Sequence, residues 1–481
     1  MSTIWPNLNA PQRAWQHDRS GQHDRSRPMI LMAALLFAVA LGACAAPAPH
    51  PSVSPAAEPI RIGAVFPLGG NAGTLAKQEL AGVEIAADFI NADGGISGRP
   101  IVLDVRDLES RADAPSVMAT LRADGAVAVI GAYSSDLSIA ASAAADSAGL
   151  VYWEAGAVAD RLTGRGLPMV FRVGASGSNL GVNSASFAAS QLAPRLATSV
   201  SGLRLAIVAA DDDYARSVAD AAARTAQNAG MPIVARTTYN LTLPDWPALM
   251  NELKSARPSV IILASHIPDG VAFRRAMLVA GLKVQALIGS TMAECDPDFA
   301  GDLGPDAVGI FASDRPTGGF QPGALAPVAR ATYDRLAAAW TTLYPRAMSG
   351  RGYSNGPAAS GRETYAIAGP VEAGSAQAGP SEEGLSGFSA AWALFHDILP
   401  TAARSGPLDA ARVADAARTA DLPSGSLPNG AGLRFSSDPG TLGQNERAAA
   451  VIWQWQAIRS YTFVWPATYA TGTIAFVPLS R

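Results

Sequence analysis

Short runs of β-branched and other apolar residues recur along this chain, separated by alanine-rich stretches with helical periodicity. The runs are continuously apolar rather than alternating, which is typical of parallel strands covered by helices on both faces. They start near Ile60, Ile101, Val127 and Leu150 in a first series, and near Leu203, Ile233, Ser259 and Gln285 in a second. In the second series the starts lie about 26–30 residues apart, the length of one strand plus one helix. The pattern predicts two parallel, doubly wound α/β sheets.

Helical periodicity fills the intervals between these strands and continues into the last third of the chain. Between the strands, helices are expected over residues 82–91, 114–123, 136–148, 214–229, 246–256 and 269–280. Two more are expected over 324–343 and 384–403, and a final strand over 448–457. The stretch 344–383 between those two helices is rich in Gly, Ser, Ala and Pro, and we interpret it as a flexible surface excursion.

Length and composition limit the class of protein. The body from residue 60 to residue 481 is too long for a single hydrophobic core, so two lobes are expected. Hydrophobic residues make up 49% of the chain and the formal net charge is −4, so the composition shows no basic excess of the kind that favours nucleic-acid binding. No second membrane-spanning segment is expected after the N-terminal apolar run.

That apolar run, residues 29–40, has the layout of a secretory signal. Arg25 and Arg27 precede it, and Leu41-Gly42-Ala43 supply the small residues of a cleavage site before Cys44. The segment resembles a bacterial lipobox, in which the thiol of Cys44 would receive a diacylglyceryl group. The alternative is an ordinary secretion signal with an incidental cysteine.

The lipobox reading divides the N-terminal part into a leader, 1–43, and a lipid-anchored tether, 44–59, rich in Pro, Ala and Ser. It places the protein at the extracytoplasmic face of the cell membrane. Cys295 is the other cysteine, so no intramolecular disulfide is expected in the mature chain.

Several segments, in order and at matching spacings, resemble the type I periplasmic binding proteins. They are IRIGAVFPLGG from residue 60, GVEIAADFINADGGISGRPI from 82, VAVIGAYSSDLS from 127, FRV from 171, DDDY from 211, DWPALMNELKSARPSVIILAS from 245 and FRRAMLVAGLK from 273. The resemblance covers residues 60–310 and 448–456. Its nearest branch is the branched-chain amino-acid and amide-binding receptors of ABC transporters.

This resemblance implies two Rossmann-like lobes joined by a hinge of three crossovers, near Arg172, Ser313 and Trp453. Lobe one would comprise residues 60–172 plus 313–450, and lobe two 173–312 plus 451–481. The ligand would lie in the cleft where the carboxyl ends of the strands of both lobes face each other, as in open α/β sheets generally.

In lobe one, Ser134 and Ser135 follow the third strand and precede a helix. Helix N–H groups with a hydroxyl can bind an anion or a carbonyl oxygen; the alternative is that Ser135 or Asp136 only caps the helix. The resemblance favours Ser135 as a ligand contact. It also places Leu75 where relatives close an aromatic side chain over the ligand.

The segment after the fourth strand contains three small residues, Ala155, Gly156 and Ala157, whose backbone can approach a ligand. The resemblance assigns the ligand's polar head to this segment, although Trp153-Glu154 replaces the usual Ser-Pro. Glu154 is either a carboxylate at the cleft mouth that favours an amine-bearing ligand, or a solvated charge at a strand end.

In lobe two, Tyr214 aligns with a tyrosine that faces the ligand, and His266 lies at the cleft end of its strand. Thr291 and Glu294 follow the next strand, where relatives place an acidic residue against an ammonium group; Glu294 stands three residues late for that role. The triplet at 211–213 could suggest a metal, but helix capping by Asp213 explains it better.

Enzymatic chemistry finds no support in the sequence. His266 and His396 are the only histidines of the body, and no nucleophile elbow, Walker loop or metal-spaced cluster occurs. We therefore expect no catalytic residues, no cofactor and no metal.

The expected function is capture of a small polar ligand (amino acid, amide or urea-like) for an ABC permease and its ATPase. A sensor of the same fold and, less favoured, an extracytoplasmic hydrolase are the alternatives. The altered wall at Leu75 and at His266-Ile267 predicts weak binding of leucine, isoleucine and valine.

Overall fold

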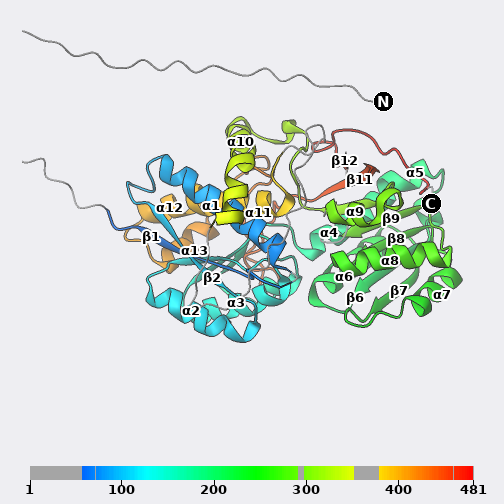
Figure 1. Cartoon of the computed structure of the whole chain (residues 1–481), viewed down its shortest axis with the longest axis horizontal. Helices are drawn as coiled ribbons and strands as arrows, with labels where there is room; N and C mark the ends of the chain where they lie inside the picture. The colour runs from blue at the N-terminus through cyan, green and yellow to red at the C-terminus, as the bar shows by residue number, and fades with distance from the viewer. Residues whose placement is uncertain (1–56, 71, 291–296, 351–378, 459, 480–481) are drawn as a thin grey trace, which may run out of the picture. The chain divides into compact units, whose positions relative to one another are not determined.

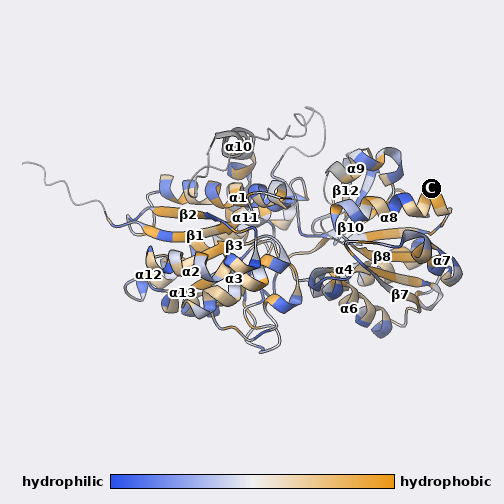
Figure 2. Cartoon of the chain, turned by 60° about the horizontal axis from the view of Figure 1, so that its bottom comes forward, coloured by the Kyte–Doolittle hydropathy of each residue, from blue (hydrophilic) through white to orange (hydrophobic). Residues whose placement is uncertain are grey.

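The first sheet of the computed structural model, which describes residues 57–70, 72–290, 297–350, 379–458 and 460–479, is five-stranded and parallel. Its strand order is β2-β1-β3-β4-β5. The strands are β1 (Ile60–Phe66), β2 (Ile101–Asp107), β3 (Ala128–Gly131), β4 (Val151–Glu154) and β5 (Val170–Arg172). Helices α1 and α11 cover one face and α2 and α3 the other (Figure 2). Alternate residues of β1 therefore belong to two different cores. Ala64 and Phe66 pack in one core and Val65 packs in the other.

The second sheet has seven strands in the order β12-β11-β10-β9-β8-β6-β7. Five are parallel, while β11 runs antiparallel to β10 and β12 antiparallel to β11. The strands are β6 (Leu205–Ala210), β7 (Ile233–Tyr239), β8 (Val260–Ala264), β9 (Ala286–Ser290), β10 (Phe311–Asp314), β11 (Val451–Ala457) and β12 (Ser460–Trp465). Helices α4 and α6 lie on one side and α8 and α9 on the other (Figure 2), so β6, β8 and β9 are buried throughout.

The helices start and end where the sequence supplies caps. Ser134 accepts a hydrogen bond from the N–H of Leu137 at the start of α3, and α8 ends at Gly281, whose φ of 65° suits glycine. The helices are α1 (Gly73–Ala92), α2 (Ala114–Ala123), α3 (Ser135–Ser147), α4 (Gly177–Phe187), α5 (Ala193–Arg195), α6 (Asp213–Asn228), α7 (Trp246–Ala256), α8 (Ile267–Ala280), α9 (Pro297–Leu303), α10 (Pro327–Gly350), α11 (Glu382–Trp392), α12 (Leu399–Arg404) and α13 (Ala410–Arg418).

The chain passes between the two sheets at three places. It leaves the first sheet after Arg172, the last residue of β5, and leaves the second sheet after β10 to form α10 and α11. It returns just before β11, where Gln444 forms a bridge with Arg172. Trp453, near which the third crossover was expected, lies inside β11, two residues after that strand begins.

Helices α1 and α11 lie side by side in direct backbone contact (Figure 1). Glycines make this approach possible. A Cβ atom on Gly82 would lie 2.2 Å from the carbonyl oxygen of Gly384, and one on Gly387 would lie 2.0 Å from the carbonyl oxygen of Glu79. Glu79 is thereby fixed against α11 at the centre of the helix pair.

The two predicted doubly wound α/β sheets are confirmed, and the eight strands of the two expected series are all present. α1 begins nine residues before the predicted helix, at Gly73. Helices α4, α5, α9 and α13 and strands β5, β10 and β12 were not predicted. The predicted surface excursion 344–383 is wrong over residues 344–350, which continue α10, and its central part, 351–378, lies outside the described residues. None of the described helices is long and apolar enough to cross a membrane.

Candidate functional site

At the carboxyl end of β3, Ser134 and Ser135 have different roles. The hydroxyl of Ser134 caps α3, so the alternative that Ser135 or Asp136 is the cap is wrong. The Ser135 hydroxyl accepts a hydrogen bond from the N–H of Ala159 at 3.1 Å. A hydroxyl that accepts one bond can still donate one. Ser135 is half-buried and connects the start of α3 to the loop that follows β4.

At the carboxyl end of β4, Glu154 turns its carboxylate back onto its own loop. Its Oε1 atom accepts the N–H groups of Ala155, Gly156 and Ala157 at 3.1, 2.9 and 2.8 Å. Its Oε2 atom accepts the hydroxyl of Tyr152 at 3.0 Å. Glu154 is completely buried, so both expectations for it, a carboxylate at a cleft mouth and a solvated charge, are wrong. The three N–H groups expected to face a ligand are used within the loop.

The loop between β4 and the short helix η2 (Asp160–Leu162), called here the β4–η2 loop (residues 155–159), is also held by its carbonyl groups. Arg315 donates to the carbonyl of Gly156 at 2.6 Å. Arg172 donates to the carbonyl groups of Ala157 and Ala159 at 3.3 and 2.7 Å. The N–H of Gly177 donates to the carbonyl of Val158 at 2.5 Å. Both arginines lie where the chain passes between the sheets, so the loop is attached to two of the three passages.

Buried acidic side chains surround this loop. Glu79 is fully buried, and neither of its carboxylate oxygens has a hydrogen-bond partner. Burial, followed by the charge of Glu154, raises the pKa of Glu79 well above its ordinary value. Burial and the charge of Glu382 do the same to the pKa of Asp314. Glu79 and Asp314 are therefore the groups of this cluster that hold protons most strongly.

The two buried arginines respond in opposite ways. Burial lowers the pKa of Arg172 to about 10. Burial also acts to lower the pKa of Arg315, but the charges of Glu382 and Asp314 outweigh it and the pKa is raised. Arg315 donates to Glu382 through Nε at 2.5 Å and is charged throughout the accessible pH range. Neither Glu79 nor Arg315 was predicted from the sequence as a site residue.

At the carboxyl ends of the second sheet, Tyr214 and His266 lie together. Tyr214 is buried, and its single O–H faces two carbonyl acceptors, that of Ser265 at 3.1 Å and that of Ser290. The His266 ring packs edge-on against Tyr214, with 5.2 Å between ring centroids. Its Nε2 atom lies 3.0 Å from Oδ2 of Asp212, and the two side chains are 22% and 30% exposed. This Asp212–His266 pair is polar, partly accessible and at the expected edge of the sheet.

Asp212, rather than the predicted Asp213, caps α6, since its Oδ1 accepts the N–H of Ala215 at 2.8 Å. Asp213 is the first helical residue and pairs with Arg161 at 3.0 Å. The N–H of Asp160 also donates to the Ser217 hydroxyl at 3.0 Å. The strand-end segment of the first sheet thus contacts the first turns of α6.

The other predicted site residues are less informative. Leu75 is buried in the first turns of α1. Thr291 and Glu294 lie outside the described residues, as do Cys44 and the leader. Within the parts of the chain that the structure describes, no group of three or more His, Cys, Asp or Glu side chains could hold a metal ion.

The Asp212–His266 pair makes stability depend on pH. Burial acts to lower the pKa of His266, but the hydrogen bond and charge of Asp212, with the charge of Asp269, outweigh it and raise the pKa. Burial likewise acts to raise the pKa of Asp212, and His266 overcomes it, so that pKa is lowered. Protonated His266 with ionised Asp212 is therefore the favoured state between the two folded pKa values.

We expect His266→Gln to cost about 1 kcal/mol of unfolding free energy near pH 5–6. The cost should be full below the unfolded pKa of histidine and disappear as pH rises through the raised folded pKa of His266. It should also fall in acid, as Asp212 is protonated. Urea unfolding across pH 4–9 measures this difference. Asp212→Asn, which keeps an N-cap, should show the same pH profile, and a pH-independent difference in both variants would contradict the pair.

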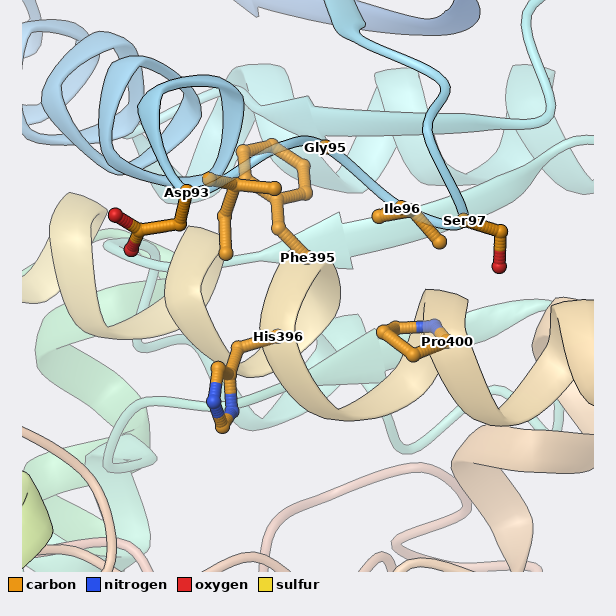
Figure 3. A pocket seen from close by; sticks show the side chains of 8 residues that line it. Asp93, Gly95, Ile96, Ser97, Phe395, His396 and Pro400 are labelled. Carbon is orange, nitrogen blue, oxygen red and sulfur yellow. The ribbon is translucent and has the colours of Figure 1, made fainter.

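A pocket of about 290 Å³ lies elsewhere, at the end of α1. Figure 3 shows Gly95, Ile96 and Ser97 of the turn after α1 opposite Phe395 and His396. This pocket is separate in sequence from the strand ends at which the polar side chains gather, and we do not assign the ligand to it.

Known proteins resemble this chain over most of its length. A model of the family "Periplasmic binding protein" matches residues 59–360. The Leu/Ile/Val-binding protein homolog 8 of Brucella abortus is 28% identical over 419 residues, 87% of this chain and 93% of that protein.

Solved structures share the fold at lower identity. A leucine-binding protein from Thermotoga maritima matches with a TM-score of 0.62 and 16% identity, over 84% of this chain and 98% of that one. A fatty acid ABC transporter substrate-binding protein from Thermomonospora curvata matches with a TM-score of 0.60 and 16% identity, over 87% and 96%. The ligands named for these two proteins differ, so they do not identify the ligand of the present chain. The family match and the two doubly wound sheets do identify its class: the chain belongs to the periplasmic binding protein family, with the type I fold.

Proposed function

We propose that this protein captures a small polar ligand of the amino-acid, amide or urea class between the strand ends of its two sheets. It delivers that ligand to the permease and ATPase of an ABC transporter. The family match over residues 59–360 supports the binding role. The transport role is supported by the likeness to an ABC transporter substrate-binding protein of the same fold.

The observation that carries the proposal is the position of the Asp212–His266 pair. It stands at the carboxyl edge of a doubly wound sheet, where open α/β proteins bind ligands. The Asp212 carboxylate is 30% exposed and can still accept hydrogen bonds from a polar ligand, whereas Nε2 of His266 is paired with Asp212 and its Nδ1 atom is buried. Ser135, half-buried at the corresponding edge of the first sheet, supplies a further hydroxyl.

We also propose that the protein acts outside the cytoplasm, held by acyl chains on Cys44 through the tether 44–59. The apolar run and the small residues before Cys44 support this proposal. A tether rich in Pro and Ser would let the binding body reach a membrane-embedded permease.

Thermal-shift screening of the purified protein tests the ligand class. We expect amides, ureas or amino compounds to raise Tm, and leucine, isoleucine and valine to raise it little, because Leu75 and Ile267 replace aromatic groups expected from the resemblance. The ligand that raises Tm should also reduce the radius of gyration in small-angle scattering, since contacts to both lobes favour a closed state.

Two results would contradict this proposal separately. Submicromolar leucine binding by calorimetry would remove the predicted ligand preference while leaving the receptor role. Tight binding of any ligand without compaction would remove closure of two lobes as the mechanism.

A further inference from the structure

The β4–η2 loop has the geometry of an anion-binding site. Three consecutive N–H groups, from Ala155, Gly156 and Ala157, converge on one oxygen within 3.1 Å. Successive backbone N–H groups that point to one spot form a concave site for a negatively charged oxygen. In this protein the oxygen in that site is Oε1 of Glu154, the residue directly before the loop.

The bonding pattern of Glu154 is that of a carboxylate ligand. Both of its oxygens act as acceptors, Oε1 from the three N–H groups and Oε2 from the Tyr152 hydroxyl. An ionised carboxylate accepts only, whereas a protonated one must also donate. Burial raises the pKa of Glu154, but its acceptor contacts act to lower it, whereas Glu79 has no hydrogen-bond donor and its pKa is raised well above the ordinary value. Of these two acids, Glu79 therefore holds a proton more strongly.

We propose that Glu154 is a built-in carboxylate ligand: it fills an anion site at the carboxyl end of β4 and thereby excludes the carboxylate of any external molecule from that site. Glu154 is then a specificity-determining residue. If the natural ligand binds at these strand ends, as the proposed function holds, it must be recognised through groups other than a carboxylate held by this loop. That consequence rests on the proposed function, whereas the occupation of the loop by Glu154 does not.

The site does not require the Glu154 side chain for its shape. The loop carbonyls are held from outside, by Arg315 at Gly156, by Arg172 at Ala157 and Ala159, and by the N–H of Gly177 at Val158. Removal of the glutamate side chain should therefore leave the three N–H groups convergent but without an acceptor. Unpaired buried N–H groups are unfavourable, so a small free carboxylate should enter.

The Glu79 side chain limits what else can fit. A Cβ atom on residue 156 would lie 2.0 Å from Oε2 of Glu79, so the loop has no space for a side chain there. Glu154→Ala removes a CH2–COO⁻ group from this loop. Acetate has that composition and is the probe we choose.

The test is Glu154→Ala, compared with the full-length parent protein in acetate and in chloride at equal ionic strength. We expect Glu154→Ala to have a lower Tm in chloride, and acetate to raise it saturably by about 2 °C or more. The parent protein and Glu154→Gln, whose amide oxygen can still accept from the loop, should not respond. Neutral acetamide should be much less effective than acetate.

Each outcome decides the proposal. A folded Glu154→Ala protein that ignores acetate, or an equal acetate response in the parent protein, would overturn it. If Glu154→Ala does not fold in chloride, folded protein should be recovered in acetate, and failure in both salts would equally overturn it. The acetate test uses none of the compounds screened for the proposed function. Failure of the acetate test and failure of the proposed function can therefore be told apart.

Discussion

Replacing Arg315 by methionine is expected to lower the free energy of unfolding by about 3–5 kcal/mol, the range for removing one partner of a buried ion pair. Arg315 is almost fully buried and donates to Glu382 and to the carbonyl of Gly156. Methionine has similar length and no charge. It would leave Glu382 buried without a cation and the β4–η2 loop without one of its supports.

Urea unfolding followed by circular dichroism measures this loss. Arg161→Ala is the matched control, because its pair with Asp213 is exposed and should contribute less than about 1 kcal/mol. The double variant Arg315→Met/Glu382→Leu should recover much of the loss, since it removes both charges together. A cost for Arg315→Met no larger than that of Arg161→Ala would show that the buried carboxylates are already neutral.

The sheets could be predicted because their signal is local. Fully buried parallel strands must be apolar on both faces, so β6 and β8 stand out as continuous runs at a regular spacing. Helix α4 could not be predicted in this way. Its sequence GSNLGVNSASF contains residues with weak helix propensity, and it is stabilised by packing against α6. Strand β12 alternates buried and partly exposed residues, the pattern of an edge strand outside the expected parallel series.

The position of the site could be predicted in part, for a topological reason. Parallel strands bring their carboxyl ends to one edge, so Ser135, Glu154, Tyr214 and His266 all lie at strand ends as expected. Which way Glu154 points could not be predicted. That depends on convergent N–H groups and on the neighbouring Tyr152 hydroxyl, and a one-dimensional pattern contains neither.

The buried charges depend on contacts between residues far apart in the chain. Arg315 contacts Gly156, 159 residues away, and Glu382, 67 residues away. One signal was available for Glu79. It stands among the buried apolar residues of α1, beside Leu80 and one turn before Gly82 and Val83. An acidic residue on the apolar face of a helix indicates a buried polar contact, because an isolated buried charge is too costly to keep.

The second large effect is expected from one added methyl group. Gly387→Ala should destabilise the protein by about 2–3 kcal/mol, although alanine favours a helix by about 1 kcal/mol over glycine. The new Cβ would lie 2.0 Å from the carbonyl oxygen of Glu79 and 2.8 Å from its carbonyl carbon. These are backbone atoms within α1, so they can move only if the two helices separate.

Separation of α1 from α11 would also move Glu79, and with it the charged cluster next to the β4–η2 loop. Gly323→Ala is the control, because the nearest atom to its new Cβ lies 3.9 Å away, and its effect should stay within about 0.5 kcal/mol. Thermal unfolding compares the two variants. If Gly387→Ala is as stable as Gly323→Ala, the helices can slide apart without loss, and close packing of α1 on α11 does not hold Glu79 in place.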